Sequence, residues 1–284
     1  MNLASPRTVR ELLARHGLET KKSLGQNFLV DGNTLRRIVE AAEISPEDSV
    51  LEIGTGLGIL TRELARRAGR VVTVEIDRSL APVLEETLRD LVNIQQVFGD
   101  FLKQPLAELL PAGDNWKVVA NLPYYITTPI LFRLLEGPVP LRRLVFLVQK
   151  EVAQRAAALP GGKTYGALSV TLQHRCQVQV AGLVPPTVFI PPPKVDSAIL
   201  VLTPLARTFP EEAEGVFRKL VETAFRYRRK TLANAWSKLN LDWVGPAELN
   251  SVWSTLKIDP GIRGECLSVA EFEAVAEHLL AQRR

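Results

Sequence analysis

The chain has 284 residues, of which 46% are hydrophobic and 23% are charged, and these are ordinary values for a globular protein. They exclude a disordered or collagen-like chain, and the length fits one large domain with or without a small one. Lysine and arginine outnumber the acidic residues by 35 to 31, and the net charge of +4 permits a polyanionic partner without requiring one.

The first predicted element is a helix at Thr8–His16. Its arginines also fit a transit segment, but the acidic Glu11 favours an ordinary helix. Further along, short β-branched runs alternate with helical stretches such as Leu60–Arg67 and Leu80–Leu88. This alternation predicts an α/β fold with a mostly parallel, doubly wound sheet. Its first five strands are expected at Val50–Ile53, Val71–Glu75, Ile94–Phe98, Lys117–Asn121 and Leu144–Gln149.

Two later strands are expected near Leu168–Val180 and at Ser197–Thr203, with the proline-rich segment Val184–Lys194 between them. Because this segment contains no crossover helix, it predicts an antiparallel edge to the sheet. Prolines fix φ and stiffen the segment, so Phe189 within it suits the wall of a ligand site. Its neighbours Val188 and Ile190 fit a core position for Phe189 equally well.

The last part of the chain reads as helical, with helices predicted at Glu211–Leu239 and Val269–Gln282. We therefore expect a sheet domain at residues 1–205 and a small all-α domain at residues 206–284.

Few residues of this chain suit metal chemistry. Two cysteines, Cys176 and Cys266, cannot form a disulfide framework or a four-thiolate zinc site, and they suit a reducing cytosol. The three histidines have no ligand spacing, so no metal site is expected. Neither a run of about 18 apolar residues nor a secretory signal is visible. We expect a cytoplasmic protein without a membrane segment.

A glycine-rich turn follows the first predicted strand of the sheet. Gly54, Gly56 and Gly58 let the backbone turn sharply and let a ligand approach the main chain closely. Their G-x-G-x-G spacing differs from the G-x-G-x-x-G of dinucleotide-binding proteins, which favours a nucleoside-type ligand without phosphates. The spacing also argues against a nicotinamide dehydrogenase. Because many strand-to-helix turns carry two glycines, this turn is not decisive alone.

Acidic residues end the next two strands. Glu75 lies about 20 residues after the first glycine, where a carboxylate accepts hydrogen bonds from ribose hydroxyls. Asp100 follows the third strand, where it is placed to accept a bond from an adenine amino group. Each acid alone also fits a solvated strand end. Their order on successive strands after the glycine turn predicts the binding of an adenosine group.

The segment from Asn121 to Tyr124 directly follows the fourth strand, where ligands bind in open α/β sheets. One reaction that such a segment would suit is the methylation of an exocyclic aromatic amine. This amine is a poor nucleophile because its lone pair is delocalised into the ring. The Asn121 side-chain oxygen and the Leu122 carbonyl would draw such an amine towards tetrahedral geometry. Pro123 would shape the turn, and Tyr124 would offer a π-face to the base. A turn that only caps the strand is the alternative.

Several motifs occur in one order along nearly the whole chain: Lys21–Leu29, Glu52–Gly58, Val74–Asp77, Gly99–Asp100, Asn121–Thr127 and Phe189–Ser197. In this combination the sequence resembles the ribosomal RNA adenine dimethyltransferase family, which acts on small-subunit rRNA and whose loss confers kasugamycin resistance in bacteria. The resemblance implies a Rossmann-like class I methyltransferase sheet, a helical C-terminal domain and the cofactor S-adenosyl-L-methionine.

The resemblance also implies the role of each motif residue. The catalytic residues would be Asn121, Leu122, Pro123, Tyr124 and Phe189, and the two aromatic rings would stack on opposite faces of the target adenine. The cofactor-binding residues would be Asn27, Leu29, Gly54, Gly56, Glu75, Asp100 and Asn121. The implied product carries two N6-methyl groups on each of two adjacent adenosines near the 3′ end of small-subunit rRNA. The implied partner is this rRNA within a small subunit or its precursor, and we expect a monomer.

Two basic segments suit contacts with RNA phosphates, and arginines interleaved with aromatics also suit base stacking. The expected RNA-binding residues are Lys21, Lys22, Arg226, Arg228, Arg229 and Lys230. A solvated helix face gives the same pattern of charge, with Phe225 packing inward.

Two other functions stay open at this point. A large-subunit rRNA adenine methylase of the antibiotic-resistance type would share these motifs. A non-catalytic RNA-binding assembly factor would keep the fold without turnover, although the intact Asn121–Tyr124 segment argues against the loss of catalysis.

Overall fold

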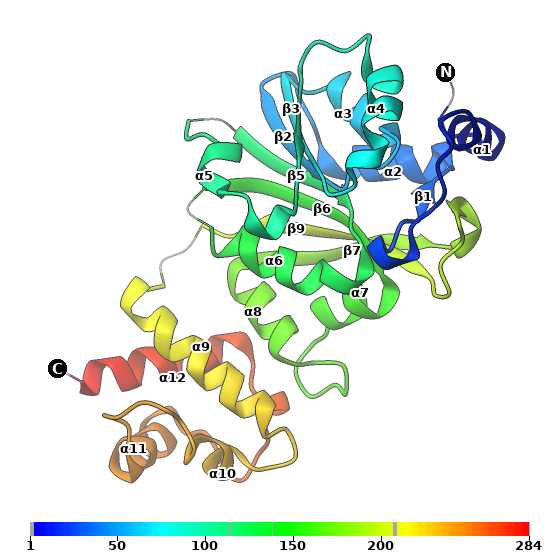
Figure 1. The fold of residues 1–284 in the computed structure, drawn as a ribbon. Coiled ribbons are helices and arrows are strands. Elements are labelled where there is room, and N and C mark those ends of the chain that lie inside the picture. The colour runs from blue at the N-terminus through cyan, green and yellow to red at the C-terminus, as the bar shows by residue number, and fades with distance from the viewer. Residues whose placement is uncertain (1–2, 114, 138, 207–208, 284) are drawn as a thin grey trace. The chain divides into compact units, whose positions relative to one another are not determined.

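Helices and strands alternate along the chain in the computed structural model, which describes residues 3–113, 115–137, 139–206 and 209–283 (Figure 1). The α-helices are α1 (Pro6–Arg15), α2 (Gly32–Ala42), α3 (Ile59–Ala65), α4 (Ala81–Leu88), α5 (Leu106–Leu109), α6 (Thr127–Leu135), α7 (Lys150–Ala156), α8 (Ala167–Arg175), α9 (Glu211–Arg226), α10 (Leu232–Trp236), α11 (Pro246–Leu256) and α12 (Val269–Gln282). The strands are β1 (Phe28–Leu29), β2 (Asp48–Ile53), β3 (Arg70–Glu75), β4 (Ile94–Phe98), β5 (Asn115–Asn121), β6 (Leu141–Gln149), β7 (Cys176–Val184), β8 (Phe189–Ile190) and β9 (Ser197–Pro204). Short 3₁₀ helices include η1 (Lys22–Leu24), η2 (Arg78–Leu80), η3 (Phe101–Lys103) and η4 (Tyr124–Ile126).

The chain divides into two compact units. The sheet unit comprises Met1–Ala153 and Gln179–Pro204, and the helical unit comprises Gln154–Val178 and Leu205–Arg284. The expected division at residue 205 therefore omitted one segment of the helical unit. The reason is α8, which occupies the first half of the strand expected near Leu168–Val180 and whose Val170 is buried in the core of the helical unit, whereas the second half of that strand is the start of β7.

A seven-stranded sheet in the order β4-β3-β2-β5-β6-β9-β7 forms the main part of the fold. Strand β2 pairs in parallel with β3 and with β5, β3 with β4, and β5 with β6. Strand β9 pairs antiparallel with β6 and lies between β6 and the edge strand β7. The expected mostly parallel sheet with an antiparallel end is confirmed, and its antiparallel strand lies one place inside the edge.

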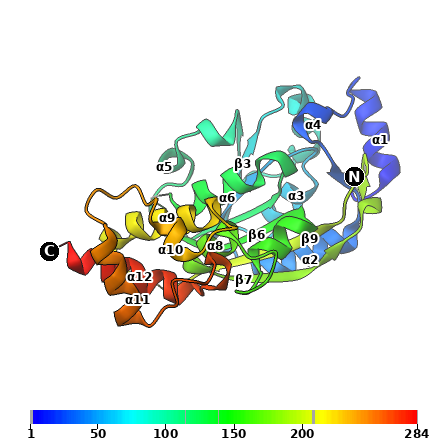
Figure 2. The same ribbon diagram turned by 90° about the horizontal axis from the view of Figure 1, so that it is seen from below.

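The inner strands are buried on both faces, which explains why they read as continuous apolar runs. Helices α2 and α3 cover one face, where Ile38 and Leu64 pack with Val119, Val145 and Ile199 in one core. Helix α6 lies on the opposite side of the sheet (Figure 2). Because β2, β3 and β5 are adjacent and parallel, the loops at their carboxyl ends meet at one edge.

A small second sheet joins two segments that are far apart in the sequence. Strand β1 pairs antiparallel with β8, with Phe28 opposite Ile190 and Leu29 opposite Phe189. Neither strand was predicted, because a two-residue strand gives too short an alternation to read. The pairing attaches the proline-rich segment to the N-terminal segment.

The helical unit has its own aromatic core around Phe217, Trp236 and Phe272. The single helix expected at Glu211–Leu239 is instead α9 and α10. A turn separates them, in which the backbone N–H of Lys230 donates to the Tyr227 carbonyl and Thr231 caps the new helix. Helix α11 was not predicted. None of the described helices is long and apolar enough to cross a lipid bilayer.

Candidate functional site

The glycine turn after β2 forms the floor of a cavity. Gly54 and Gly56 have φ values of +80° and +56°, in the left-handed region that favours glycine. The backbone N–H of Gly54 donates to the carbonyl of Val74 at 2.9 Å, so the turn is held to β3. A Cβ at Gly56 would lie 3.3 Å from the ring of Phe28, so glycine here also permits close packing.

Glu75 lies at the end of β3 with its carboxylate held by main-chain donors. The N–H of Gly56 donates to Oε2 at 2.9 Å, and the N–H of Asp77 donates to Oε1 at 2.8 Å. Burial raises the pKa of Glu75, and these N–H donors partly oppose the rise. Since a carboxylate has about four lone-pair positions, each oxygen keeps capacity to accept a ligand hydroxyl.

Asn121 lies at the end of β5 with its side-chain amide in one fixed orientation. Its Nδ2 donates to the backbone carbonyl of Asn27 at 3.0 Å. Because a carbonyl only accepts, this bond places the amide nitrogen of Asn121 towards Asn27. The amide oxygen is thereby left to accept a hydrogen bond from a ligand amine, which is the function that the sequence predicts for it.

The rest of the Asn121–Tyr124 segment is also held in place. The N–H of Leu122 donates to the carbonyl of Leu147 at 3.1 Å, which continues the sheet beyond β5. The hydroxyl of Tyr124 lies 2.6 Å from Oγ of Ser197 on β9. Burial raises the pKa of Tyr124. The hydroxyl contact fixes the ring at the wall of the cavity.

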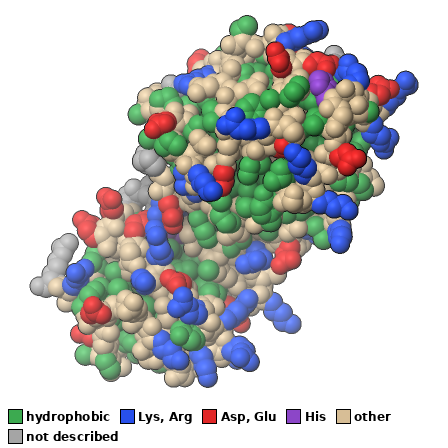
Figure 3. Space-filling view, in the orientation of Figure 1, with side chains coloured by type: hydrophobic (Ala, Val, Ile, Leu, Met, Phe, Trp, Pro, Cys, Tyr) green, Lys and Arg blue, Asp and Glu red, His purple; other side chains and the backbone are tan. Residues whose placement is uncertain are grey.

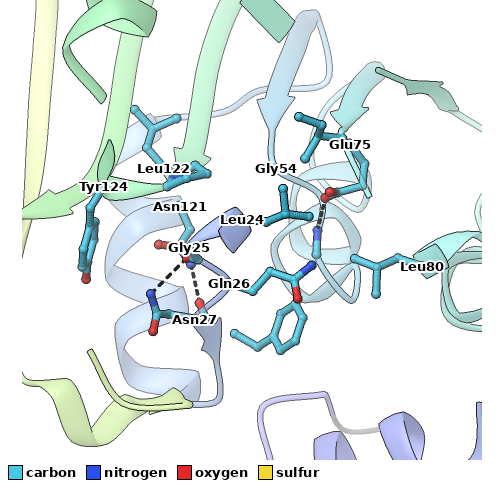
Figure 4. Close-up of a pocket in the computed structure, with 14 residues that line it drawn as sticks. Leu24, Gly25, Gln26, Asn27, Gly54, Glu75, Leu80, Asn121, Leu122 and Tyr124 are labelled. Atoms are coloured by element: carbon cyan, nitrogen blue, oxygen red, sulfur yellow. Dashed lines mark hydrogen bonds between the residues drawn. The ribbon is translucent and has the colours of Figure 1, made fainter. Parts of the chain in front are cut away.

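These residues line an open cavity of about 550 Å³ (Figure 4). Tyr124 and Glu75 lie on opposite sides of it, with Asn121 between them. The residues that line it are Leu24, Gly25, Gln26, Asn27, Phe28, Gly54, Gly56, Glu75, Ile76, Leu80, Asn121, Leu122, Pro123 and Tyr124. The structure therefore brings together eight of the predicted site residues, from Asn27 to Tyr124.

A second cavity of about 440 Å³ adjoins the first, and the two share Phe28, Gly54, Gly56 and Asn121. Leu29 lines it, as does Thr55, whose buried hydroxyl has no hydrogen-bond partner among the described residues. An unpartnered buried hydroxyl is unfavourable unless a ligand or water bonds to it. Polar side chains also line the cavities, with Glu75 in the first and Asn121 in both.

Glu52 also lines the second cavity, and it is almost completely buried. The hydroxyl of Thr61 donates to its Oε2 at 2.6 Å. Burial raises the pKa of Glu52 well above its usual value, the Thr61 hydroxyl opposes the rise, and the charge of Glu75 adds to it.

Two predicted residues lie apart from these cavities. Phe189 is only 2% exposed and packs in the sheet core, which is the alternative position that the sequence left open for it, and its role as an aromatic clamp stays a prediction. The physical reason for its burial is the β1–β8 pairing, which turns the ring inward beside Leu29. Asp100 caps η3, where its carboxylate accepts from the N–H of Leu102 at 3.0 Å, and it lines neither cavity.

Several lining residues had no role in the sequence reasoning. Ile76 directly follows Glu75 and is 43% exposed, and only its adjacency to that strand end could have indicated it. Leu80 and Thr55 carry no motif signal of their own. Among the described residues, no group of His, Cys, Asp and Glu is arranged to hold a metal ion.

The basic residues expected to contact RNA differ in their surroundings. Nζ of Lys21 pairs with Asp77 at 2.7 Å, whereas Lys22 is exposed beside it. In the helical unit, Arg226 pairs with Glu222 and Arg228 pairs with Glu265. Within the described part of the chain, Arg229 and Lys230 take part in no ion pair and are exposed. Figure 3 shows Lys and Arg side chains gathered along the lower right of the helical unit.

Comparison with known proteins identifies the family. The sequence model described as ribosomal RNA adenine dimethylase matches residues 17–279. The chain belongs to this family. It is 44% identical to the ribosomal RNA small subunit methyltransferase A of Bacillus mycoides, and the match covers 99% of each chain.

Two solved structures show that the fold is that of a class I methyltransferase. A dimethyladenosine transferase from Plasmodium falciparum is 29% identical, with a TM-score of 0.75 over 90% of this chain and 96% of that one. The 23S rRNA methyltransferase ErmE is 30% identical, with a TM-score of 0.69 over 89% of this chain and 99% of the other. The fold class predicted from the sequence is confirmed.

The buried Glu52 predicts a pH-dependent difference in stability. Its folded-state pKa lies above the unfolded value, so the folded chain retains a proton that the unfolded chain has lost. The free energy of unfolding should therefore fall as the pH rises through this window. Glu52→Gln should remove this loss, so its stability relative to the wild type should increase between about pH 5 and pH 8 in urea titrations. A difference that stays constant or decreases with pH would contradict the raised pKa.

The position of Phe189 predicts a separation of stability from activity. Phe189→Ala should lower the free energy of unfolding by about 3–5 kcal/mol because it leaves a cavity in the sheet core. Phe189→Leu keeps most of the apolar volume, so methyl transfer per folded molecule should stay within about threefold of the wild type. A ring that stacks on a base contributes roughly 1–3 kcal/mol. A ten- to hundredfold lower rate of methyl transfer in folded Phe189→Leu would therefore support the role of Phe189 as an aromatic clamp.

Proposed function

We propose that this chain transfers methyl groups from S-adenosyl-L-methionine to N6 of two adjacent adenosines near the 3′ end of small-subunit rRNA, two to each adenosine. The observation that carries the proposal is the amide oxygen of Asn121, which accepts no hydrogen bond from the described residues and lies between Tyr124 and the Glu75 side of the cavity. Membership of the ribosomal RNA adenine dimethylase family supports the reaction. The name of the relatives that match along the whole chain supports the small subunit as the source of the RNA.

A large-subunit substrate is the second candidate, because the structure resembles a 23S rRNA methyltransferase over most of its length. The identity to that enzyme is 30%, whereas the small-subunit relatives are 43–44% identical. The small subunit is therefore the better supported substrate. A non-catalytic assembly factor is less well supported, since the Asn121–Tyr124 segment is ordered around an open cavity.

The residues around the two cavities fit the methyl donor. Glu75 would accept hydrogen bonds from the ribose hydroxyls, and Gly54 and Gly56 would lie against the methionine part. Asn27 and Leu29 would form the wall on the N-terminal side. Asp100 lines neither cavity and follows β4, and we propose that it accepts from the adenine amino group beyond their edge. When bound, S-adenosyl-L-methionine supplies a methyl group on a positively charged sulfur.

Asn121, Leu122 and Tyr124 would position the target amine. The Asn121 oxygen and the Leu122 carbonyl would accept its two hydrogens and draw the nitrogen towards tetrahedral geometry, so that its lone pair is no longer delocalised into the ring. Tyr124 would stack on the adenine after the base leaves its own stack, which is less costly in an RNA loop than in a duplex. The alkylated amine becomes acidic and loses its proton to water, so no strong general base is required. Positioning of this kind supplies up to about 7–11 kcal/mol.

We further propose that the protein acts in the cytoplasm as a monomer, with the ribosomal small subunit or its precursor as its partner. The composition supports this setting, since two cysteines and a modest positive charge suit a reducing compartment and an RNA partner.

Transfer of labelled methyl groups to unmodified small subunits tests the reaction. Asn121→Ala should lower the rate roughly 100-fold or more because it removes the acceptor that orients the amine. Tyr124→Ala should reduce the rate strongly, whereas Tyr124→Phe keeps the ring face and loses only the hydrogen bond with Ser197. Mapping of the label to adenine N6 in small-subunit rRNA supports the proposal. Label in the large subunit, or activity unchanged in Asn121→Ala, would contradict it.

The unpaired basic residues of the helical unit predict a change in salt dependence. Replacing both Arg229 and Lys230 by Ala should weaken binding to small subunits and reduce the slope of log affinity against log salt. The reduction should be roughly 0.7–0.9 for each phosphate that the variant no longer neutralises. Arg66→Ala with Arg67→Ala is the matched control, because it removes two positive charges that already pair with Glu63. Equal slopes in the two double variants would exclude a specific role for Arg229 and Lys230.

A further inference from the structure

Asp77 is a buried carboxylate just beyond the proposed ribose-binding position, and the mechanism above does not use it. Its side chain is 4% exposed. Its Oδ1 accepts from Nζ of Lys21 at 2.7 Å and from the hydroxyl of Ser79 at 2.6 Å, and its Oδ2 accepts from Nε2 of Gln26 at 2.8 Å. Burial alone would raise the pKa of Asp77, but the bonds from Lys21, Ser79 and Gln26 outweigh it and lower the pKa. These hydrogen bonds therefore stabilise the ionised form of the Asp77 carboxylate.

Two of these partners belong to the N-terminal segment, and that segment closes on itself. The side-chain oxygen of Gln26 accepts from the backbone N–H of Lys21 at 2.8 Å, so Gln26 is bonded at both ends of its amide. Between them, η1 is followed by Gly25, whose φ of +62° lets the chain reverse. Lys21 and Gln26 are thus the two ends of a small loop, and both are attached to Asp77.

The same loop continues directly into the wall of the site. Five consecutive residues, Leu24 to Phe28, line the first cavity. Nδ2 of Asn27 donates to the carbonyl of Gly25 at 3.1 Å, and the Asn27 carbonyl accepts from Nδ2 of Asn121. Asp77 is therefore bonded to Gln26, Asn121 is bonded to the next residue, Asn27, and the backbone between Gln26 and Asn27 joins the two contacts.

We propose that Lys21, Gln26 and Asp77 form a latch, and that this latch positions the N-terminal wall of the donor cavity and orients the Asn121 amide. Lys21 is then a positioning residue and does not contact RNA phosphates as its charge alone suggests. This inference rests on the proposed function, because it assigns the latch to the binding of the methyl donor. Three features of the site depend on the latch: the wall formed by Leu24–Phe28, the carbonyl of Asn27, and the free oxygen of Asn121.

The latch also lies next to the carboxylate proposed to bind ribose. The backbone N–H of Asp77 donates to Oε1 of Glu75, and its side chain accepts from Lys21 and Gln26. Asp77 therefore contacts both the N-terminal loop and Glu75, and it links the two through its own side chain and backbone. A shift of the loop should therefore weaken the binding of the methyl donor more than the binding of RNA.

Calorimetric binding of S-adenosyl-L-methionine and S-adenosyl-L-homocysteine to the full chain tests the latch. Lys21→Ala should weaken both affinities roughly tenfold, as expected when a hydrogen bond to a charged group no longer stabilises the bound conformation. Lys21→Arg keeps a cation within reach of Asp77 and should restore most of the affinity. Gln26→Ala breaks the same latch without a change of charge and should give the same pattern as Lys21→Ala. Arg7→Ala is the control, because it breaks an exposed ion pair with Glu11 in the same N-terminal segment.

The steady-state constants separate the latch from an RNA contact. With unmodified small subunits, Lys21→Ala should raise the KM for the donor and leave the KM for the subunits within about twofold. Amide hydrogen exchange should become faster at residues 21–28 in Lys21→Ala and Gln26→Ala, whatever the midpoint of thermal unfolding. Unchanged donor affinity in both variants would overturn the latch. So would a raised KM for subunits with a flatter salt slope in Lys21→Ala.

The design also separates the latch from the proposed function. If the wild-type chain binds the donor but methylates no small subunit, the proposed function fails. Weaker donor binding in Lys21→Ala and Gln26→Ala, with Arg7→Ala unaffected, would still support the latch.

Discussion

The parallel alignment of β2, β3 and β5 is the constraint on which the rest of the site depends. Three loops leave the same edge of the sheet in adjacent positions, and main-chain hydrogen bonds join the loops after β2 and β5 to a neighbouring strand. The glycine turn, Glu75 and Asn121 therefore have no freedom to separate without disrupting the sheet itself. A rigid frame of this kind lets catalysis rely on position, which matches a site without an obvious acid–base pair.

Burial of acidic groups is the energetic counterpart of this arrangement. Glu52 and Glu75 lie close enough for their charges to interact, and burial raises the pKa of both. Each would be less unfavourable at the surface, so the fold keeps them at some loss of stability near neutral pH. Main-chain donors from Gly56 and Asp77 reduce that loss for Glu75 and fix the direction of its oxygens. The fold thus loses some stability by burying Glu75, and it gains a carboxylate whose oxygens are already oriented to accept hydrogen bonds.

The sequence predicted the parts of the fold that depend on local pattern. The five parallel strands were found because they are buried runs separated by helices, and Gly54, Glu75 and Asn121 were found because each follows such a strand. Long-range pairing could not be read in this way. The β1–β8 pairing turned Phe189 inward, and the partner of Lys21 lies on another motif. Helix α8 occupies the first half of the strand expected near Leu168–Val180, where Val170 packs in the helical unit, and β7 begins in its second half. The charge of Lys21 alone predicted an RNA contact, and its buried partner Asp77 could be found only from the structure.

The pairing of β1 with β8 has a consequence for biosynthesis. Phe28 and Leu29 leave the ribosome long before Phe189 and Ile190, which they must meet to form their small sheet. A nascent chain therefore lacks a settled N-terminal wall until nearly the whole sheet unit has emerged. The site therefore cannot form fully during the early part of translation, because β1 has no partner strand until β8 has been synthesised.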